Sequence, residues 1–271
     1  MNKTTYGESL FERYLRSQGM SFEREPPLPG ITQRIDFVIS HPDCGKILLE
    51  VKDIENPPPP SGFFDQHRPV RAHIEAGTRK FKNTADYVCI LVLAAPPGSF
   101  VQLNDPITMM GSMYGNLGFR VPVDVARGIA APDKIVPAYL VGEGKMIRKT
   151  RLQNTRIAAV ISVIDFNIWH YAMRTYVNTE DGRSREERVH DVQNGQVELP
   201  DFEAAVPGVT VWENGVANRK LPRDLFKGEM DAWWEVSSDG RQLPTFIGQR
   251  RRILEVDKAT LRNLGISPRA P

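Results

Sequence analysis

The run from Tyr87 to Leu93 is the feature that most restricts how this chain can fold. Its residues, Tyr-Val-Cys-Ile-Leu-Val-Leu, are almost all apolar. A short continuous apolar run of this kind is typical of a strand buried on both faces, which occurs where helices cover both sides of a sheet. We therefore expect residues 87–93 to form a central strand of an α/β fold.

Helical and strand patterns alternate before this run. Residues 5–18 predict an amphipathic helix, with Gly19 as its C-terminal stop. Residues 34–39 and 47–52 predict two strands joined into a hairpin by a turn at residues 41–45.

A second helix is expected between the hairpin and the central strand. Residues 54–69 contain the run Pro57–Pro60 and predict a loop, and residues 70–83 then show a helical pattern. Gly77 falls on the apolar face of that helix, where it would permit a close approach of the backbone to a neighbour. The order helix, strand, strand, helix, strand indicates a mixed sheet flanked by helices.

The remainder of the chain has weaker patterns. Residues 96–135 are rich in Gly, Pro and Met, and residues 178–196 form a polar, charged segment. Strands are expected at residues 138–141, 158–164 and 209–212, and short helices near residues 123–128 and 258–264.

Composition sets broad limits. The 271 residues are 41% apolar and 25% charged, as in an ordinary soluble globular protein, and no stretch approaches the roughly 20 apolar residues of a membrane span. Two cysteines are too few for a disulfide framework or a four-cysteine zinc site, and the N-terminus has no secretory pattern, so we expect a cytoplasmic protein. A net charge of +2 permits a nucleic-acid partner without indicating one.

Three charged residues in the two hairpin strands carry the strongest chemical signal. Glu50 and Lys52 are two positions apart on one strand, so their side chains leave the same face, and Asp36 on the preceding strand can pair alongside. The flanking apolar residues, Leu49 and Val51 around Glu50 and Ile35 and Phe37 around Asp36, are expected on the other face. Charges within such strands are costly unless they are paired or bind a metal. Mg²⁺ prefers oxygen ligands and needs only one or two carboxylates from the protein.

This arrangement resembles the PD-(D/E)XK superfamily of restriction-endonuclease-like nucleases. The resemblance covers residues 5–95 and includes Glu8 on the opening helix, Asp36, and the triplet Glu50-Val51-Lys52; Ile35 stands where the family name has proline. It implies that Asp36 and Glu50 bind Mg²⁺, for which Mn²⁺ can substitute. It also implies that Lys52 activates the attacking water, and that Glu8 adds an outer contact.

The resemblance also implies a fold and a substrate. We expect an α/β restriction-endonuclease-like core at residues 1–135, and a mixed α+β C-terminal extension at residues 136–271 that packs on the core. The expected reaction is Mg²⁺-dependent hydrolysis of phosphodiester bonds, with DNA preferred to RNA as the substrate, and an enzyme that acts on RNA stays open as an alternative. The partner is then nucleic acid and not a membrane, and the sequence leaves open a homodimer or a partner subunit.

Basic residues on the second helix are candidates for binding the scissile phosphate. Arg79 and Lys82 are three positions apart and share a helix face, and His73 lies on the same helix. A second basic run, from Lys145 to Arg156, could follow a phosphate backbone. For each of these residues the alternative is a solvated surface.

Other interpretations remain open at this stage. The three charged strand residues could form ion pairs on an exposed sheet face. The chain could also be a catalytically inactive nuclease-fold module that binds nucleic acid or a protein partner, although such a module would need none of the three residues. A second Glu-x-Lys triplet at Glu143-Gly144-Lys145 has no Asp-bearing strand before it and predicts a turn.

Overall fold

A computed structural model of the chain describes most of its residues. The described residues are 4–55, 65–96, 99–120, 123–124, 129–130, 136–141, 144–148, 151–167, 173, 176–178, 182–198, 205–228, 230–235, 245–246 and 267–268. Within these ranges no helix has the length and apolar character needed to cross a membrane.

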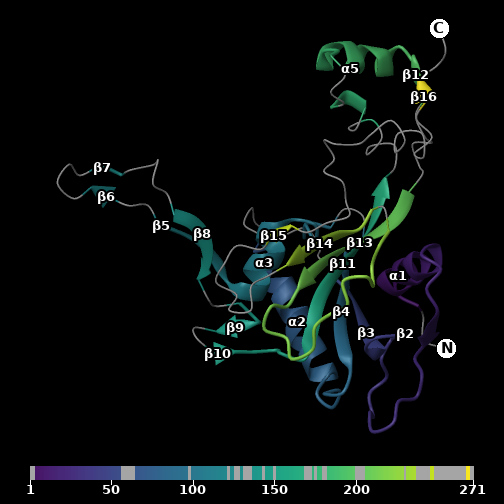
Figure 1. Cartoon of the computed structure of the whole chain (residues 1–271), viewed down its shortest axis with the longest axis vertical. Helices are drawn as coiled ribbons and strands as arrows, with labels where there is room; N and C mark the ends of the chain where they lie inside the picture. Colours follow the sequence, from purple (N-terminus) through teal and green to yellow (C-terminus); the bar gives the residue numbers. More distant parts are fainter. Residues whose placement is uncertain are drawn as a thin grey trace.

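An eight-stranded mixed sheet forms the centre of the molecule (Figure 1). Its strands, in spatial order, are β1 (Phe22–Arg24), β2 (Phe37–His41), β3 (Gly45–Asp53), β4 (Val88–Ala94), β11 (Ile157–Asn167), β13 (Ala205–Glu213), β14 (Ala232–Glu235) and β15 (Thr245–Phe246). The central strands β3, β4 and β11 are parallel to one another. Every residue of β4 is buried, so the predicted central strand is confirmed.

Helix α1 (Tyr6–Ser17) covers one face of this sheet (Figure 1). It begins at Thr5, whose side chain accepts a hydrogen bond from the backbone of Glu8, and it ends where Gly19 adopts a positive φ of 65°. Its buried residues pack with Phe37, Leu49 and Val51 in a single core cluster. The predicted opening helix is thus confirmed to within a residue at each end.

Helices α2 (His67–Lys80) and α3 (Pro106–Tyr114) cover the opposite face. Helix α2 begins three residues earlier than expected, because Pro69 falls in the first turn, where a missing backbone N–H costs nothing. The predicted close approach at Gly77 is confirmed, since a Cβ atom there would lie 2.9 Å from Leu91 Cδ1 of strand β4.

The predicted hairpin is present, but its first strand starts later than expected. Strands β2 and β3 pair from His41–Gly45 to Phe37–Leu49. The residues before Phe37 leave the ladder, and Ile35 packs in the cluster on the α2 side while Phe37 packs on the α1 side. The expectation that Ile35 and Phe37 share a face is therefore wrong, since strand alternation does not extend to Ile35.

The sheet continues across residue 135, where the sequence predicted a boundary. Strand β11 pairs with β4, and β13 pairs with β11, so residues on both sides of that position contribute to one sheet. Two further antiparallel pairs, β5 (Asn116–Arg120) with β8 (Val136–Val141) and β6 (Val123–Asp124) with β7 (Ile129–Ala130), extend away from the sheet (Figure 1).

Several elements differ from the sequence-based expectations. Helix α3 lies within the region predicted as irregular, and helix α5 (Arg185–Gln193) lies within the polar segment. Residues 123–124 are strand β6 where a helix was expected. The helix expected at residues 258–264 lies outside the described residues. The short remaining strands are β9 (Ile147–Arg148) with β10 (Arg151–Leu152), and β12 (Val197–Glu198) with β16 (Ser267–Pro268).

Candidate active site

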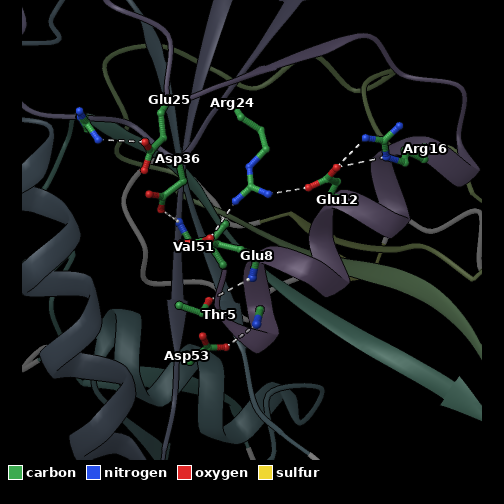
Figure 2. A network of polar contacts seen from close by, with 11 residues as sticks. Thr5, Glu8, Glu12, Arg16, Arg24, Glu25, Asp36, Val51 and Asp53 are labelled. Atoms are coloured by element: carbon green, nitrogen blue, oxygen red, sulfur yellow. Dashed lines mark hydrogen bonds and ion pairs between the residues drawn. The ribbon is translucent and has the colours of Figure 1, made fainter. Parts of the chain in front are cut away.

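Asp36 lies immediately before β2, where the pairing of β2 with β3 stops. Its carboxylate accepts a hydrogen bond from the backbone N–H of Val51 at 2.7 Å, in place of the next ladder bond (Figure 2). The carbonyl of Asp36 in turn accepts a hydrogen bond from the backbone N–H of Glu25, which follows edge strand β1. Backbone groups on both sides thus hold Asp36 against strand β3.

Glu50 is fully buried in the middle of the sheet. One of its oxygens, Oε1, accepts contacts from two ammonium groups: Lys52 Nζ at 2.6 Å and Lys80 Nζ at 3.0 Å. The other oxygen, Oε2, is buried and has no hydrogen-bond partner among the described residues. A buried carboxylate oxygen without a partner costs free energy, so this position calls for a further ligand.

The burial of Glu50 bears on one of the interpretations left open by the sequence. Its side chain has an exposed fraction of 0%, so the Glu50–Lys52 ion pair does not lie on a fully exposed sheet face. Leu49 and Val51 pack in the cluster on the α1 side, and Leu48 packs on the α2 side. The predicted alternation along β3 is confirmed, and it directs Glu50 and Lys52 toward α2.

Asp36 and Glu50 are close enough for their charges to interact. Burial, followed by the negative charge of Glu50, raises the pKa of Asp36 from 3.8 to about 6, while the Val51 hydrogen bond and the charges of Lys52 and Lys80 act in the opposite direction. A carboxyl group at a position where burial and a neighbouring negative charge both oppose its ionisation is typical of functional sites.

Glu8 approaches the same place from helix α1. Burial and then the charge of Asp36 raise the pKa of Glu8, which places the two carboxylates near each other. Arg24 of β1 contacts Glu8 at 2.9 Å and Glu12 at 2.8 Å (Figure 2). Its guanidinium group also lies over the ring of Phe37. Arg24 therefore connects the edge strand to the first two turns of α1.

Asp53 fixes the start of helix α1 on the end of strand β3. Its Oδ1 atom accepts a hydrogen bond from the backbone N–H of Gly7 at 2.6 Å (Figure 2). A Cβ atom at Gly7 would lie 2.5 Å from that oxygen and 2.7 Å from Ala94 Cβ, so only glycine fits there. Sequence reasoning missed this contact, because a Gly–Asp pair 46 positions apart carries no local signal.

The predicted phosphate-binding residues on α2 occupy different places. His73 lies on the side of the helix that faces β3, where burial and then the charge of Lys52 lower its pKa. Arg79 is 72% exposed and pairs with Glu75, and Lys82 is exposed beyond the last residue of α2. The structure brings His73 near Lys52 and Asp53 of strand β3, whereas Arg79 and Lys82 are exposed.

Lys80 belongs to the basic stretch of α2 that the sequence indicated, but it was not among the residues predicted to bind phosphate. It lies seven positions after His73 and three after Gly77, so it shares the helix face that approaches the sheet. Arg79 and Lys82 were predicted instead because they share a helix face, without comparing that face with the apolar face that contains Gly77. Gly77 was the available signal, since a glycine at a close contact marks the inward face.

The residues present fit a hard divalent cation. Two carboxylates, one of which has a buried oxygen without a hydrogen-bond partner among the described residues, match the small number of protein oxygens that Mg²⁺ or Mn²⁺ requires. Asp36 and Glu50 would hold the cation, with Glu8 nearby. No group of three or more His, Cys, Asp or Glu residues arranged to hold a metal occurs in the described part of the chain.

The second Glu-x-Lys triplet has a packing role at its described residues. A Cβ atom at Gly144 would lie 2.2 Å from the carbonyl oxygen of Met113, so the chain is pressed against the end of α3 there. Lys145 pairs with Glu75 at 2.6 Å, and Arg156 donates to the carbonyl of Lys82. Two members of the second basic run thus bind the protein itself.

Comparisons of the chain with protein-family models, with curated proteins and with solved structures gave no match.

Proposed function

We propose that this chain is a divalent-cation-dependent nuclease with a restriction-endonuclease-like core, and that its substrate is DNA. The observation that carries the proposal is the fully buried Glu50, which lies beside Asp36 and Lys52 and has one oxygen without a partner in the described part of the chain. The order α1, β2, β3, α2, β4 is also the order that the resemblance to PD-(D/E)XK nucleases implies.

Each residue has a distinct part in this proposal. Asp36 and Glu50 hold the cation through carboxylate oxygens, and the backbone amide of Val51 fixes the orientation of Asp36. The Lys52 ammonium orients the attacking water and offsets negative charge at the phosphate. When bound, a divalent cation supplies activation of water and stabilisation of charge on the phosphate oxygens.

The test is a cleavage assay with matched variants. Plasmid, linear duplex, single-stranded DNA and RNA are incubated with Mg²⁺, Mn²⁺ or EDTA. The wild type should cut DNA only with a cation, and Glu50→Ala should abolish cleavage. Glu55→Ala is the matched control, since Glu55 is exposed just beyond the same strand and should leave the rate unchanged.

Three outcomes would contradict the proposal or one of its parts. Binding of DNA without cleavage under any cation would favour the inactive binding module. Cleavage of RNA alone would support the proposed nuclease activity but contradict the proposal that the substrate is DNA. A folded Glu50→Ala protein that cuts at the wild-type rate would remove Glu50 from the mechanism.

A further inference from the structure

Two lysines from different elements converge on a single oxygen atom. Lys52 of β3 and Lys80 of α2 both contact Glu50 Oε1, at 2.6 Å and 3.0 Å, whereas Oε2 has no partner among the described residues. Any cation that uses both oxygens of Glu50 must therefore approach an oxygen that two ammonium groups already contact.

The charges of four side chains at this position already balance, and the nearby Glu8 is paired with Arg24. Asp36 and Glu50 supply two negative charges when ionised, and Lys52 and Lys80 supply two positive charges. Adding a divalent cation would place four positive charges against two negative ones in a largely buried site. Like charges at such distances repel strongly where water is excluded. The excess is relieved if one ammonium leaves or if an anion enters.

Lys80 is better placed to leave than Lys52. Its contact with Glu50 is the longer of the two, and it comes from a helix rather than from the same strand as Glu50. Its side chain is 28% exposed, so the ammonium group has a route to solvent. A lysine side chain is a flexible four-carbon stem, and its ammonium group binds phosphate as a point charge.

We propose that Lys80 is the counter-ion that a divalent cation displaces from Glu50, and that the displaced ammonium group binds a backbone phosphate of the nucleic acid. This inference rests on the proposed nuclease function. Cation and nucleic acid then each strengthen the binding of the other. A phosphate that binds Lys80 draws its ammonium group away from Glu50 and so favours the cation. A cation bound at Glu50 displaces the same ammonium group and so frees it to bind phosphate. By linkage, the two effects are equal in size.

The experiment measures cation affinity rather than activity. Ca²⁺ is titrated calorimetrically into the protein, with and without a short DNA duplex whose phosphorothioate linkages resist hydrolysis. For the wild type, DNA should tighten Ca²⁺ binding by about tenfold, within the usual range of coupling between sites. Lys80→Met should bind Ca²⁺ more tightly than the wild type without DNA, and the gain on adding DNA should disappear.

Three further variants separate this role from a structural one. Lys80→Arg keeps the charge and should retain the coupling. Lys80→Gln repeats the neutralisation with a polar side chain, in case Lys80→Met is poorly folded. Lys46→Met removes an exposed lysine at the other end of strand β3 and should change neither Ca²⁺ affinity nor coupling.

Equal or weaker Ca²⁺ binding by a folded Lys80→Met or Lys80→Gln protein in the absence of DNA would overturn the inference. If the wild type nevertheless cuts DNA with Mg²⁺, the nuclease function stands and only the role of Lys80 fails. If the wild type neither binds a divalent cation nor cuts DNA, the proposed function fails as well.

Discussion

The carboxylate of Asp36 accepts the backbone N–H of Val51 at 2.7 Å, one residue beyond the end of the β2–β3 ladder. This contact holds a carboxylate beside Glu50 at a position where burial and like charge both oppose its ionisation. The arrangement therefore stores an unfavourable interaction, which a cation would relieve. That consequence can be measured without any assay of activity.

Asp36→Asn should stabilise the metal-free protein near neutral pH. The pKa of Asp36 is raised from 3.8 to about 6, so the folded state binds its proton more tightly than the unfolded state does. The stabilisation from this proton is fully present below about pH 4 and is lost as the pH rises through about 6. Asparagine carries no charge, and its carbonyl can still accept the Val51 N–H. In urea denaturation with EDTA at pH 7.5, we expect a gain of about 1–2 kcal/mol that shrinks at pH 5.

The control for this measurement is Asp86→Asn. Asp86 is exposed, so its substitution should change the free energy of unfolding by less than about 0.5 kcal/mol at either pH. An Asp36→Asn protein that is less stable than the wild type at pH 7.5 would show that the folded protein stabilises the Asp36 carboxylate, contrary to this account.

Local patterns were sufficient to predict most elements that build the candidate site. The apolar face and Gly19 predicted helix α1, and alternation along β3 separated Glu50 from Leu49 and Val51. Helix α3 was missed because nearly all its residues are buried, so it has no polar face to produce a helical period. Asp105 and Pro106 were the available signal, as N-cap and first residue of that helix.

Contacts between distant segments could not be predicted in the same way. The Lys80–Glu50 pair depends on how α2 is rotated against the sheet, and the Gly7–Asp53 bond depends on where α1 docks. The chain leaves the ladder at Asp36 because Ile35 packs in the opposite core cluster, which alternation alone does not reveal. Tertiary packing determines the Lys80–Glu50 pair, the Gly7–Asp53 bond and the end of the ladder at Asp36.

Gly7→Ala should destabilise the protein despite the higher helix propensity of alanine. The new methyl group would lie 2.5 Å from Asp53 Oδ1 and 2.7 Å from Ala94 Cβ, so α1 must shift away from β3. We expect a loss of about 1–3 kcal/mol, which exceeds the gain of about 1 kcal/mol from propensity. Ser9→Ala, at an exposed position of the same helix, should be neutral or stabilising in the same denaturation experiment. Equal stability of Gly7→Ala and Ser9→Ala would contradict the close packing.

Arg24→Met should loosen the edge strand β1 from helix α1. Arg24 pairs with both Glu8 and Glu12 while stacking on Phe37, so its loss should cost about 1 kcal/mol, and less in high salt. Arg34→Met is the matched control, because Arg34 is 75% exposed and, among the described residues, its ion pair is with Glu25. Its effect should stay within about 0.5 kcal/mol. A larger loss for Arg34→Met than for Arg24→Met would argue against the network.

Arg79→Ala and Lys82→Ala test whether the exposed end of α2 meets the nucleic-acid backbone. Both side chains lie away from the buried carboxylates, so neither substitution should alter Ca²⁺ affinity without DNA. If each residue contacts one phosphate, DNA binding should weaken for all sequences, and the slope of log K against log salt should fall by about 1 per variant. Fluorescence anisotropy at several salt concentrations measures this slope, and an unchanged slope would remove the residue from the interface.

Lys52→Met and Glu50→Gln should separate cation binding from the chemical step. Lys52 is not a metal ligand, and its ammonium group occupies Glu50 Oε1 at 2.6 Å. Lys52→Met should therefore bind Ca²⁺ at least as tightly as the wild type, while cleavage with Mg²⁺ falls by about 10²–10⁴-fold.

Glu50→Gln loses a ligand charge, so it should lose both cation binding and cleavage while DNA binding in EDTA is retained or strengthened. Both variants need melting curves, since Glu50→Gln leaves Lys52 and Lys80 without their buried charged partner and is expected to be less stable for that reason alone. A folded Lys52→Met protein that no longer binds Ca²⁺ would show that Lys52 maintains the shape of the site, and the assignment of Lys52 to the chemical step would then be withdrawn.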